Sequence, residues 1–271
     1  MSDTWPGQQS AESVTEPVQT GPGNWFFDGA IRTGGMRRVE YGDGGDRLVF
    51  ALGWGNKPEH DGVRWLLDRL TDAGYQVTVF QLPTTITDFQ SEYLDPVADY
   101  VAGLDSYRLL SHSTGGLITR HVEADDRLLT RTYLSPWWGF HEGLENPVVR
   151  LAMKLPISKP VLPTGDGDEQ AELGELISPE DAADGPDRAA PTFLREARRG
   201  QKAMPPFDEN DVVLYTPSDA IVGAGAIESQ TPAANRIQYE GGHELFNSRC
   251  REEHLELLLA AIDRGYAALE A

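Results

Sequence analysis

Apolar, strand-like runs alternate with helix-forming segments through the first half of the chain, and this alternation limits the possible folds more than any other feature. The strand-like runs occupy residues 46–56, 76–83, 107–113 and 129–135. After the first of them, Val63, Leu66 and Leu70 lie at helical spacing in a stretch that stops at Gly74. Alternating strands and helices form a parallel sheet with helices on both faces. The sequence therefore predicts an α/β fold with a mostly parallel central sheet.

The alternation is interrupted once, between residues 136 and 209. That segment contains many prolines and only weak helical pieces such as residues 191–200, and strand-like runs resume at 211–217 and 236–243. Before the first central strand, residues 25–33 and 35–44 are typical of a hairpin at the edge of a sheet. We therefore expect a disordered tail at 1–24, a core made of 25–135 and 210–271, and an inserted cap or lid at 136–209.

The joint between the strand-like run 107–113 and the following helical segment is unusually polar. It reads Ser111-His112-Ser113-Thr114-Gly115. This is close to Gly-x-Ser-x-Gly, the turn that exposes a nucleophilic serine between a strand and a helix, although Ser111 replaces the first glycine. The alternative is structural, because Ser, Thr and Gly also make good turns and helix caps. As a nucleophile, Ser113 needs a base and an acid that orients the base.

The stretch "SHSTGG" resembles the "GHSTGG" variant found in the α/β-hydrolase superfamily, among its serine esterases and its lysophospholipase-like and monoglyceride-lipase-like members. The resemblance extends over roughly residues 25 to 270 and implies the α/β-hydrolase fold. It also implies that an acid and then a histidine follow the nucleophile in the chain. Asp219 comes just after the run 211–217, and His243 lies in a glycine-rich loop after the next run. The resemblance therefore implies a catalytic triad of Ser113, Asp219 and His243.

These three residue types suit acyl transfer. Serine is a weak nucleophile until a histidine accepts its proton, and the aspartate fixes the histidine tautomer and stabilises its charged form. The structural alternatives are a turn-capping role for Asp219 and a solvated loop position for His243. The resemblance also implies an oxyanion hole made by the backbone amides of Thr114 and Trp54. The alternative for Trp54 is a tight turn with its side chain packed in the core.

Three aromatic residues, Trp137, Trp138 and Phe140, stand at the start of the predicted cap. They could line an apolar site for an acyl or alcohol group, or they could be core residues that anchor the cap. We expect a serine hydrolase that cleaves a neutral carboxylic ester with an apolar group, because a small-molecule substrate of high negative charge would be repelled. Amide, thioester and carbon–carbon hydrolases use the same three residues, and a non-catalytic binding protein with this fold is a further alternative.

The chain is strongly acidic, with 43 Asp and Glu against 23 Lys and Arg and a net charge of -20. This charge argues against nucleic acid as a partner. Lysine occurs only at positions 57, 154, 159 and 202. The balance resembles that of proteins from salt-loving archaea, whose acidic surfaces are screened by salt. An ordinary acidic protein is the alternative.

Several other classes are disfavoured. Cys250 is the only cysteine, so we expect no internal disulfide and a cytoplasmic location. The N-terminal residues lack the basic start and apolar centre of a signal peptide. No stretch approaches the roughly 20 apolar residues that cross a bilayer. Residues 166–177 and 223–228 depart from the calcium-loop and dinucleotide patterns, so we expect neither a metal nor a cofactor.

Overall fold

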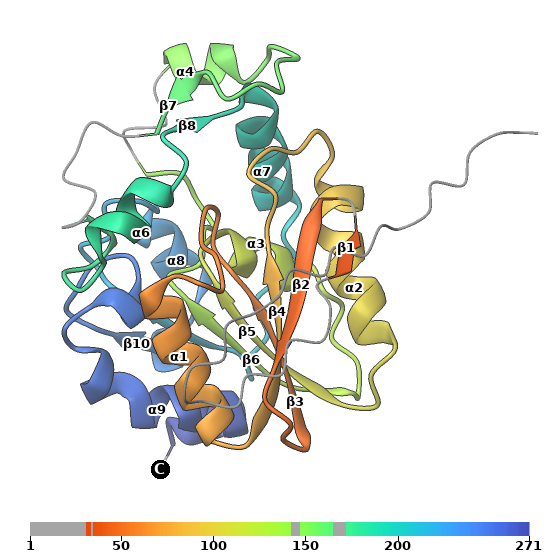
Figure 1. Ribbon diagram of the computed structural model, residues 1–271, viewed down its shortest axis with the longest axis vertical. Coiled ribbons are helices and arrows are strands. Elements are labelled where there is room, and N and C mark those ends of the chain that lie inside the picture. Colours follow the sequence, from red (N-terminus) through yellow and green to blue (C-terminus); the bar gives the residue numbers. More distant parts are fainter. Residues whose placement is uncertain (1–30, 34, 142–146, 165–171, 271) are drawn as a thin grey trace, which may run out of the picture.

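The computed structural model describes residues 31–33, 35–141, 147–164 and 172–270 (Figure 1). The expected tail at 1–24 lies outside these residues. At the centre is an eight-stranded sheet in the order β1-β2-β4-β3-β5-β6-β9-β10. The strands are β1 (Ile31–Thr33), β2 (Met36–Tyr41), β3 (Asp46–Ala51), β4 (Tyr75–Gln81), β5 (Tyr107–His112), β6 (Leu128–Leu134), β9 (Val212–Tyr215) and β10 (Arg236–Gln238).

Six of these strands, from β4 to β10 in the sheet order, pair in parallel, whereas β2 is antiparallel to both β1 and β4. The predicted mostly parallel sheet is therefore confirmed. The predicted edge hairpin is present as β1 and β2, and its residues 25–30 lie outside the described part. The parallel strands are apolar because both of their faces are buried. In β3, for example, Val49 packs in one core cluster while Leu48 and Phe50 pack in the other.

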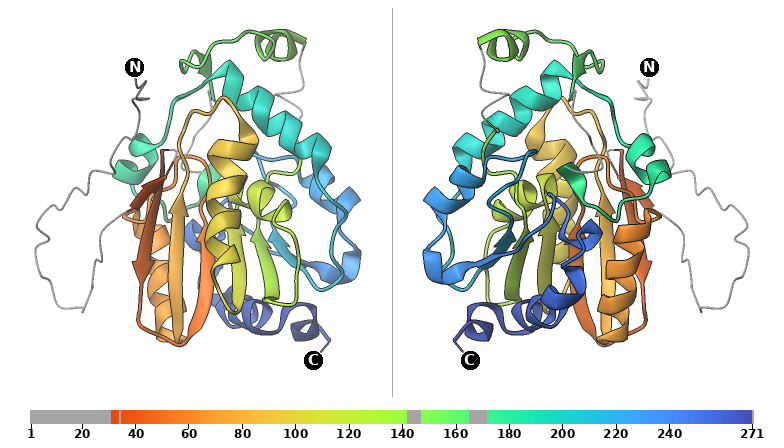
Figure 2. Two further views of the ribbon diagram at one scale, coloured as in Figure 1. Left: turned by 90° about the vertical axis from the view of Figure 1, so that its right-hand side faces the viewer. Right: turned by 90° about the vertical axis from the view of Figure 1, so that its left-hand side faces the viewer.

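Helices cover the two faces of the sheet (Figures 1 and 2). One core cluster lies beneath α1 (Asp61–Asp72) and α9 (Arg251–Arg264). The other includes residues of α2 (Asp95–Ala102), which follows the π-helical turn η1 (Gln90–Leu94), and of α3 (Thr114–Arg120). Helix α8 (Ala224–Gln230) connects β9 to the last strand through the 3₁₀ turn η3 (Ala233–Asn235).

The sequence of residues 248–269 predicts one long closing helix, but the helix in the structure is shorter. Helix α9 ends at Arg264, and the 3₁₀ turn η5 (Gly265–Ala268) follows it. Gly265 has a φ of 58°, which a glycine adopts without strain. The backbone amide of the next residue, Tyr266, donates to the carbonyl of Asn210 over 3.0 Å. The chain therefore turns here to pack against the start of β9.

Residues 136–209 contain α4 (Pro147–Ala152), β7 (Leu162–Pro163), α6 (Pro179–Asp184), β8 (Arg188–Ala189) and α7 (Pro191–Ala203). Strands β7 and β8 form a separate two-stranded antiparallel sheet. In both figures α4, β7, β8 and the start of α7 lie beyond the carboxyl ends of the parallel strands, with α4 outermost (Figures 1 and 2). Helix α7 is longer than the weak helical piece predicted at 191–200, and its Phe193, Leu194 and Ala197 are buried.

Candidate active site

Ser113 occupies a strained turn between β5 and α3. Its backbone has a φ of 50° and a ψ of −116°, a conformation that costs a non-glycine residue about 1–3 kcal/mol. Hydrogen bonds hold this conformation from both sides, because the Ser113 amide donates to Leu134 and its carbonyl accepts from Trp137, at 3.0 and 2.9 Å. The turn therefore has the strained geometry that an exposed nucleophile between a strand and a helix requires.

The small residues around Ser113 are needed because the backbone packs closely. A Cβ atom on Gly115 would overlap the carbonyl oxygen of Ala51, and one on Gly116 would lie 2.6 Å from Cβ of Pro136. Ser111 stands where the common pattern has glycine, and it is fully buried. Its hydroxyl accepts a hydrogen bond from Thr119 Oγ1 over 2.9 Å. The extra hydroxyl is thus satisfied, which explains why the turn accepts serine at this position.

The structure brings Asp219 and His243 together. Nδ1 of His243 lies 2.7 Å from Oδ2 of Asp219. The other carboxylate oxygen of Asp219 accepts from the amides of Ile221 and Val222, at 2.8 and 2.9 Å. Asp219 therefore caps its turn with one oxygen and bonds to the histidine with the other. His243 is 2% exposed, which rules out a solvated loop position.

The two groups shift each other's pKa. Burial alone would lower the pKa of His243, but the charge and the hydrogen bond of Asp219 raise it above the usual value. Burial alone would raise the pKa of Asp219, but His243 and the two backbone amides lower it below the usual value. Both shifts favour a protonated imidazole beside an ionised carboxylate. The pair can therefore stabilise a proton that the histidine accepts.

Nε2 of His243 is buried and has no hydrogen-bond partner within the described residues. The imidazole ring lies beside the strained turn, since its centroid is 4.8 Å from that of His112, the residue before Ser113. The structure gives no hydrogen bond between the Ser113 hydroxyl and this nitrogen in the described part of the chain. The structure thus joins His243 to Asp219 by a hydrogen bond, and it places the imidazole ring, with its unpaired Nε2, near the turn that carries Ser113.

The loop that carries Trp54 packs against the same turn. The amide of Asn56 donates to the carbonyl of Gly53 over 3.2 Å, which closes a turn around Trp54. A Cβ atom on Gly53 would lie 2.6 Å from Nδ1 of His112, so the loop approaches the strand end at van der Waals distance. Thr114 is the first residue of α3, and its amide has no acceptor inside the helix. The loop that carries Trp54 and the start of α3, which carries Thr114, therefore both adjoin the Ser113 turn.

A buried hydrogen-bond network behind the site was not predicted from the sequence. Its centre is the carboxylate of Glu244, which accepts from Nδ2 of Asn56 over 2.7 Å and from Nδ2 of Asn247. Oδ1 of Asn56 pairs with Nδ1 of His112 at 3.0 Å. Burial raises the pKa of Glu244, although the two amides oppose that shift. The only signal in the sequence is a glutamate directly after His243, and glutamate is almost never buried unless it is paired.

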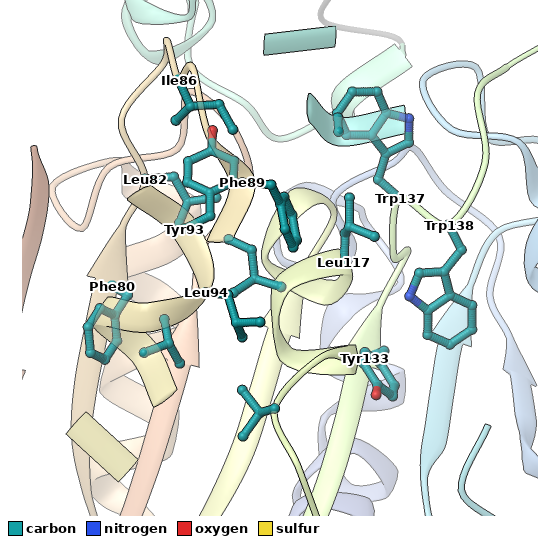
Figure 3. Packing of buried hydrophobic residues seen from close by; sticks show 14 of the residues in the cluster. Phe80, Leu82, Ile86, Phe89, Tyr93, Leu94, Leu117, Tyr133, Trp137 and Trp138 are labelled. Carbon is teal, nitrogen blue, oxygen red and sulfur yellow. The ribbon is translucent and has the colours of Figure 1, made fainter. Parts of the chain in front are cut away.

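The two tryptophans predicted for the substrate site, Trp137 and Trp138, point in different directions (Figure 3). Trp138 points into the core, where its ring packs edge-on against Tyr133 and its Nε1 donates to the carbonyl of Gly116 over 3.2 Å. Trp137 instead packs against Phe140 and against Phe193 of α7, with ring centroids 5.0 and 5.7 Å apart. The two tryptophans and Phe140 are buried in one core cluster, so the core interpretation applies to all three, and within it Trp137 forms an aromatic cluster with Phe140 and Phe193.

Trp54 joins this aromatic cluster from the other side. Its indole stacks on Phe193 with centroids 5.0 Å apart, and its Nε1 donates to the carbonyl of Thr84 over 2.9 Å. The side chain is half-buried rather than enclosed in the core.

Across residues 31–270, wherever the structure is described, no group of three or more His, Cys, Asp or Glu side chains could hold a metal ion. None of the described helices is long and apolar enough to cross a bilayer.

Comparison with known proteins adds structural but not sequence relatives. No known family model matches the sequence, and no curated protein is similar to it in sequence. The monoacylglycerol lipase of Paleococcus ferrophilus is similar in structure, with a TM-score of 0.65, 17% identity, and coverage of 86% of this chain and 99% of that chain.

Two further solved structures agree with it. A soluble variant of the Saccharomyces cerevisiae monoglyceride lipase has a TM-score of 0.62 at 14% identity and covers 90% of this chain and 96% of its own. The esterase of Exiguobacterium antarcticum has a TM-score of 0.58 at 14% identity, with coverage of 86% and 96%. Together with the parallel sheet and its strand order, these likenesses show that the chain has the α/β-hydrolase fold.

Proposed function

We propose that the protein is a serine hydrolase that cleaves neutral carboxylic esters through an acyl-enzyme intermediate. The observation that carries the proposal is the strained Ser113 turn beside a buried His243 that is bonded to Asp219 through Nδ1 and free at Nε2. Backbone strain of this size is concentrated at functional sites, so the strained conformation of Ser113 supports a functional role for it. The lipases and esterases among the structural neighbours support the same chemistry.

The proposed reaction proceeds in two acyl transfers. The Ser113 hydroxyl oxygen bonds to the ester carbonyl carbon while Nε2 of His243 accepts the hydroxyl proton. The negative oxygen that develops accepts hydrogen bonds from the amides of Trp54 and Thr114. The bond to the alcohol then breaks, and His243 gives its proton to the departing oxygen. A water molecule repeats these steps on the acyl-enzyme and releases the carboxylic acid and the free serine.

We further propose that residues 136–209 act as a cap over this site, as expected from the sequence. The backbone of this segment binds the histidine loop directly, because the amides of His243 and Glu244 donate to the carbonyls of Glu172 and Leu173 at 2.9 and 2.8 Å. Phe193 of the same segment stacks on Trp54. The aromatic rings of Trp54, Trp137 and Phe193 favour an apolar acyl or alcohol group. The net charge of -20 disfavours anionic substrates.

A fluorophosphonate probe tests the proposal, because it labels only an activated serine. We expect the wild-type protein to be labelled at Ser113 and Ser113→Ala to remain unlabelled. A panel of p-nitrophenyl esters of increasing chain length, assayed in dilute and in multimolar salt, then defines the acyl preference. Faster hydrolysis of amides or thioesters than of esters would instead assign one of those bonds as the substrate. An unlabelled, folded wild-type protein would contradict the hydrolase assignment and favour a binding protein with this fold.

A further inference from the structure

The surface formed by residues 147–164, which covers α4, the following turn and β7, differs in charge from the rest of the molecule. It contains Arg150, Lys154 and Lys159 and no Asp or Glu, within a chain of net charge -20. We propose that this basic apolar surface (residues 147–164) docks the protein on an anionic lipid surface. The proposal concerns binding and does not depend on the hydrolase chemistry.

Large apolar side chains are concentrated on this surface. Six large hydrophobic residues are exposed in the described part of the chain, and four of them belong here: Leu151 at 65%, Leu155 at 46%, Val161 at 43% and Ile157 at 36%. The remaining two, Leu129 and Leu176, stand elsewhere in the sequence. Single exposed hydrophobics are ordinary, but a group of them marks an interaction site.

The exposed side chains project from a fixed backbone. Leu151 belongs to α4, and Leu155 lies in the turn after it, where the amides of Lys154 and Leu155 donate to the carbonyls of Leu151 and Ala152 at 3.1 and 2.9 Å. Met153, between them in the sequence, is 4% exposed and packs in the core cluster that contains Trp137 and Phe193. The carbonyl of Ile157 accepts from the amide of Thr192 over 3.2 Å. The surface is therefore held in place on one side while its apolar side chains face solvent on the other.

The three cations are available for an anionic partner. Arg150, Lys154 and Lys159 are exposed, and none of them forms an ion pair with a carboxylate of the described residues. Each basic residue near an anionic membrane raises the affinity of a protein for that membrane about fivefold, so three residues together raise it on the order of a hundredfold. Repulsion from acidic residues elsewhere is limited, because the Debye length is about 8 Å at physiological salt.

Position and chemistry favour a lipid surface over a second copy of the chain. The segment lies at the outer end of the molecule, beyond the carboxyl ends of the strands, where it can meet a flat surface (Figures 1 and 2). A symmetric contact between two copies would set its three cations against the same three cations. An anionic bilayer instead offers phosphate groups to the cations and acyl chains to the leucines, which are the two requirements of an interfacial segment.

Flotation with phosphatidylglycerol and phosphatidylcholine vesicles, in salt of about physiological strength, tests the proposal. We expect the wild-type protein to bind phosphatidylglycerol vesicles at least about tenfold more tightly than phosphatidylcholine vesicles. The double variant Lys154→Glu/Lys159→Glu should lose this preference, and Leu151→Asp/Leu155→Asp should lose binding to both. Ser113→Ala should bind like wild type, so a failure of the proposed reaction does not affect this result.

Two matched controls address nonspecific effects. Leu129→Asp changes a leucine that is 48% exposed on β6, and Lys202→Glu changes an exposed lysine on α7. Both should bind vesicles like wild type. The proposal is overturned if wild type floats equally with both lipids, or if the controls lose as much binding as the test variants. A lipid-free dimer that Leu151→Asp/Leu155→Asp abolishes would also overturn it and assign the surface to self-association.

Discussion

The side-chain amide of Asn56 donates to Oε1 of Glu244 over 2.7 Å, although the two residues are 188 positions apart. Asn56 belongs to the loop that carries Trp54, and Glu244 directly follows His243. Through its other atom, Asn56 also pairs with His112 beside Ser113. A single amide thus connects the three loops that carry the proposed nucleophile, base and oxyanion hole. Asn56 and the buried carboxylate of Glu244 connect these loops through hydrogen bonds, although Glu244 has no step of its own in the proposed reaction.

Asn56→Ala should destabilise the protein by about 1.5–3 kcal/mol, because it removes a donor from a buried charged acceptor. Urea unfolding measures this change in the free energy of unfolding. Gln90→Ala is the matched control, since Gln90 donates to Asp95 over 2.6 Å at an exposed site. We expect the control to change stability by less than about 0.5 kcal/mol. An equal loss in the two variants would argue against a special role for the buried network.

The acid limb of kcat/KM should lie above pH 6.5 or so, because the reaction needs neutral His243 and its pKa is raised above the ordinary histidine value. The carboxylates of Asp219 and Glu244 both raise this pKa, while the facing His112 is kept neutral by burial. Glu244→Gln removes one negative charge, so we expect the acid limb of kcat/KM in this variant to lie at lower pH than in wild type. A pH–rate profile with an unchanged limb would contradict this electrostatic role.

The same shifts predict how stability depends on pH. The folded pKa of His243 is raised, so its contribution to the free energy of unfolding is full below the unfolded value of about 6.5 and is lost as pH rises through the folded value. The folded pKa of Asp219 is lowered, so its contribution is present above about pH 3.9 and is lost on acidification. His243→Gln should therefore be less stable than wild type by a larger margin at pH 5 than at pH 9, in urea titrations. A margin that is independent of pH would contradict the assigned coupling.

Much of the architecture was predictable because it depends on patterns that extend over many residues. Hydrophobic alternation and helical spacing placed the parallel strands and α1, and Ser113, Asp219 and His243 follow the ends of β5, β9 and β10. Features set by a single tertiary contact were not predictable. The sequence contains no sign that Gly265 ends α9 to meet Asn210, or that Trp138 enters the core while Trp137 turns toward α7. The burial of Glu244 likewise depends on Asn56, which is distant in the sequence.

Ser113 and His243 should behave as one unit in kinetics. Ser113→Ala should reduce kcat to background, and adding His243→Ala should cost little more, because each residue is useless without the other. Asp219→Asn should also be severe, since it favours the wrong histidine tautomer, with losses of about 10⁴-fold known for such a change. Steady-state rates of the single and double variants test this. Simple additivity of the two losses would contradict the proposed mechanism.

Gly115→Ala should disrupt the Ser113 turn, because the added Cβ would overlap the backbone of β3 at Ala51. We expect a loss of activity together with a stability loss of about 1–3 kcal/mol from overpacking. Gly225→Ala is the matched control, since nothing lies within 4 Å of its added Cβ and the residue belongs to α8. It should raise stability by up to about 1 kcal/mol through helix propensity. A Gly115→Ala protein with wild-type turnover would show that the close packing is not needed.

Salt should stabilise the protein if its acidic surface is an adaptation to a salt-rich cytoplasm. The 43 acidic side chains outnumber the 23 basic ones, so many carboxylates have no cation to pair with, and exposed carboxylates repel one another in dilute buffer. At 1 M salt the Debye length falls to about 3 Å, so most of this repulsion is screened. We therefore expect the thermal midpoint to rise with KCl, most steeply at low concentration.

A neutral osmolyte separates this effect from general stabilisation by excluded solutes, which act on any folded protein. In matched series of KCl and sucrose, screening predicts a steep rise at low KCl that sucrose does not reproduce, because sucrose leaves the charges unscreened. Most of the rise should be complete once the Debye length falls below the spacing of neighbouring surface charges. A midpoint that stays flat from dilute buffer to multimolar KCl would remove the salt-adapted interpretation. It would leave the proposed hydrolase chemistry unaffected, because Ser113, His243 and Asp219 are buried away from the surface charge.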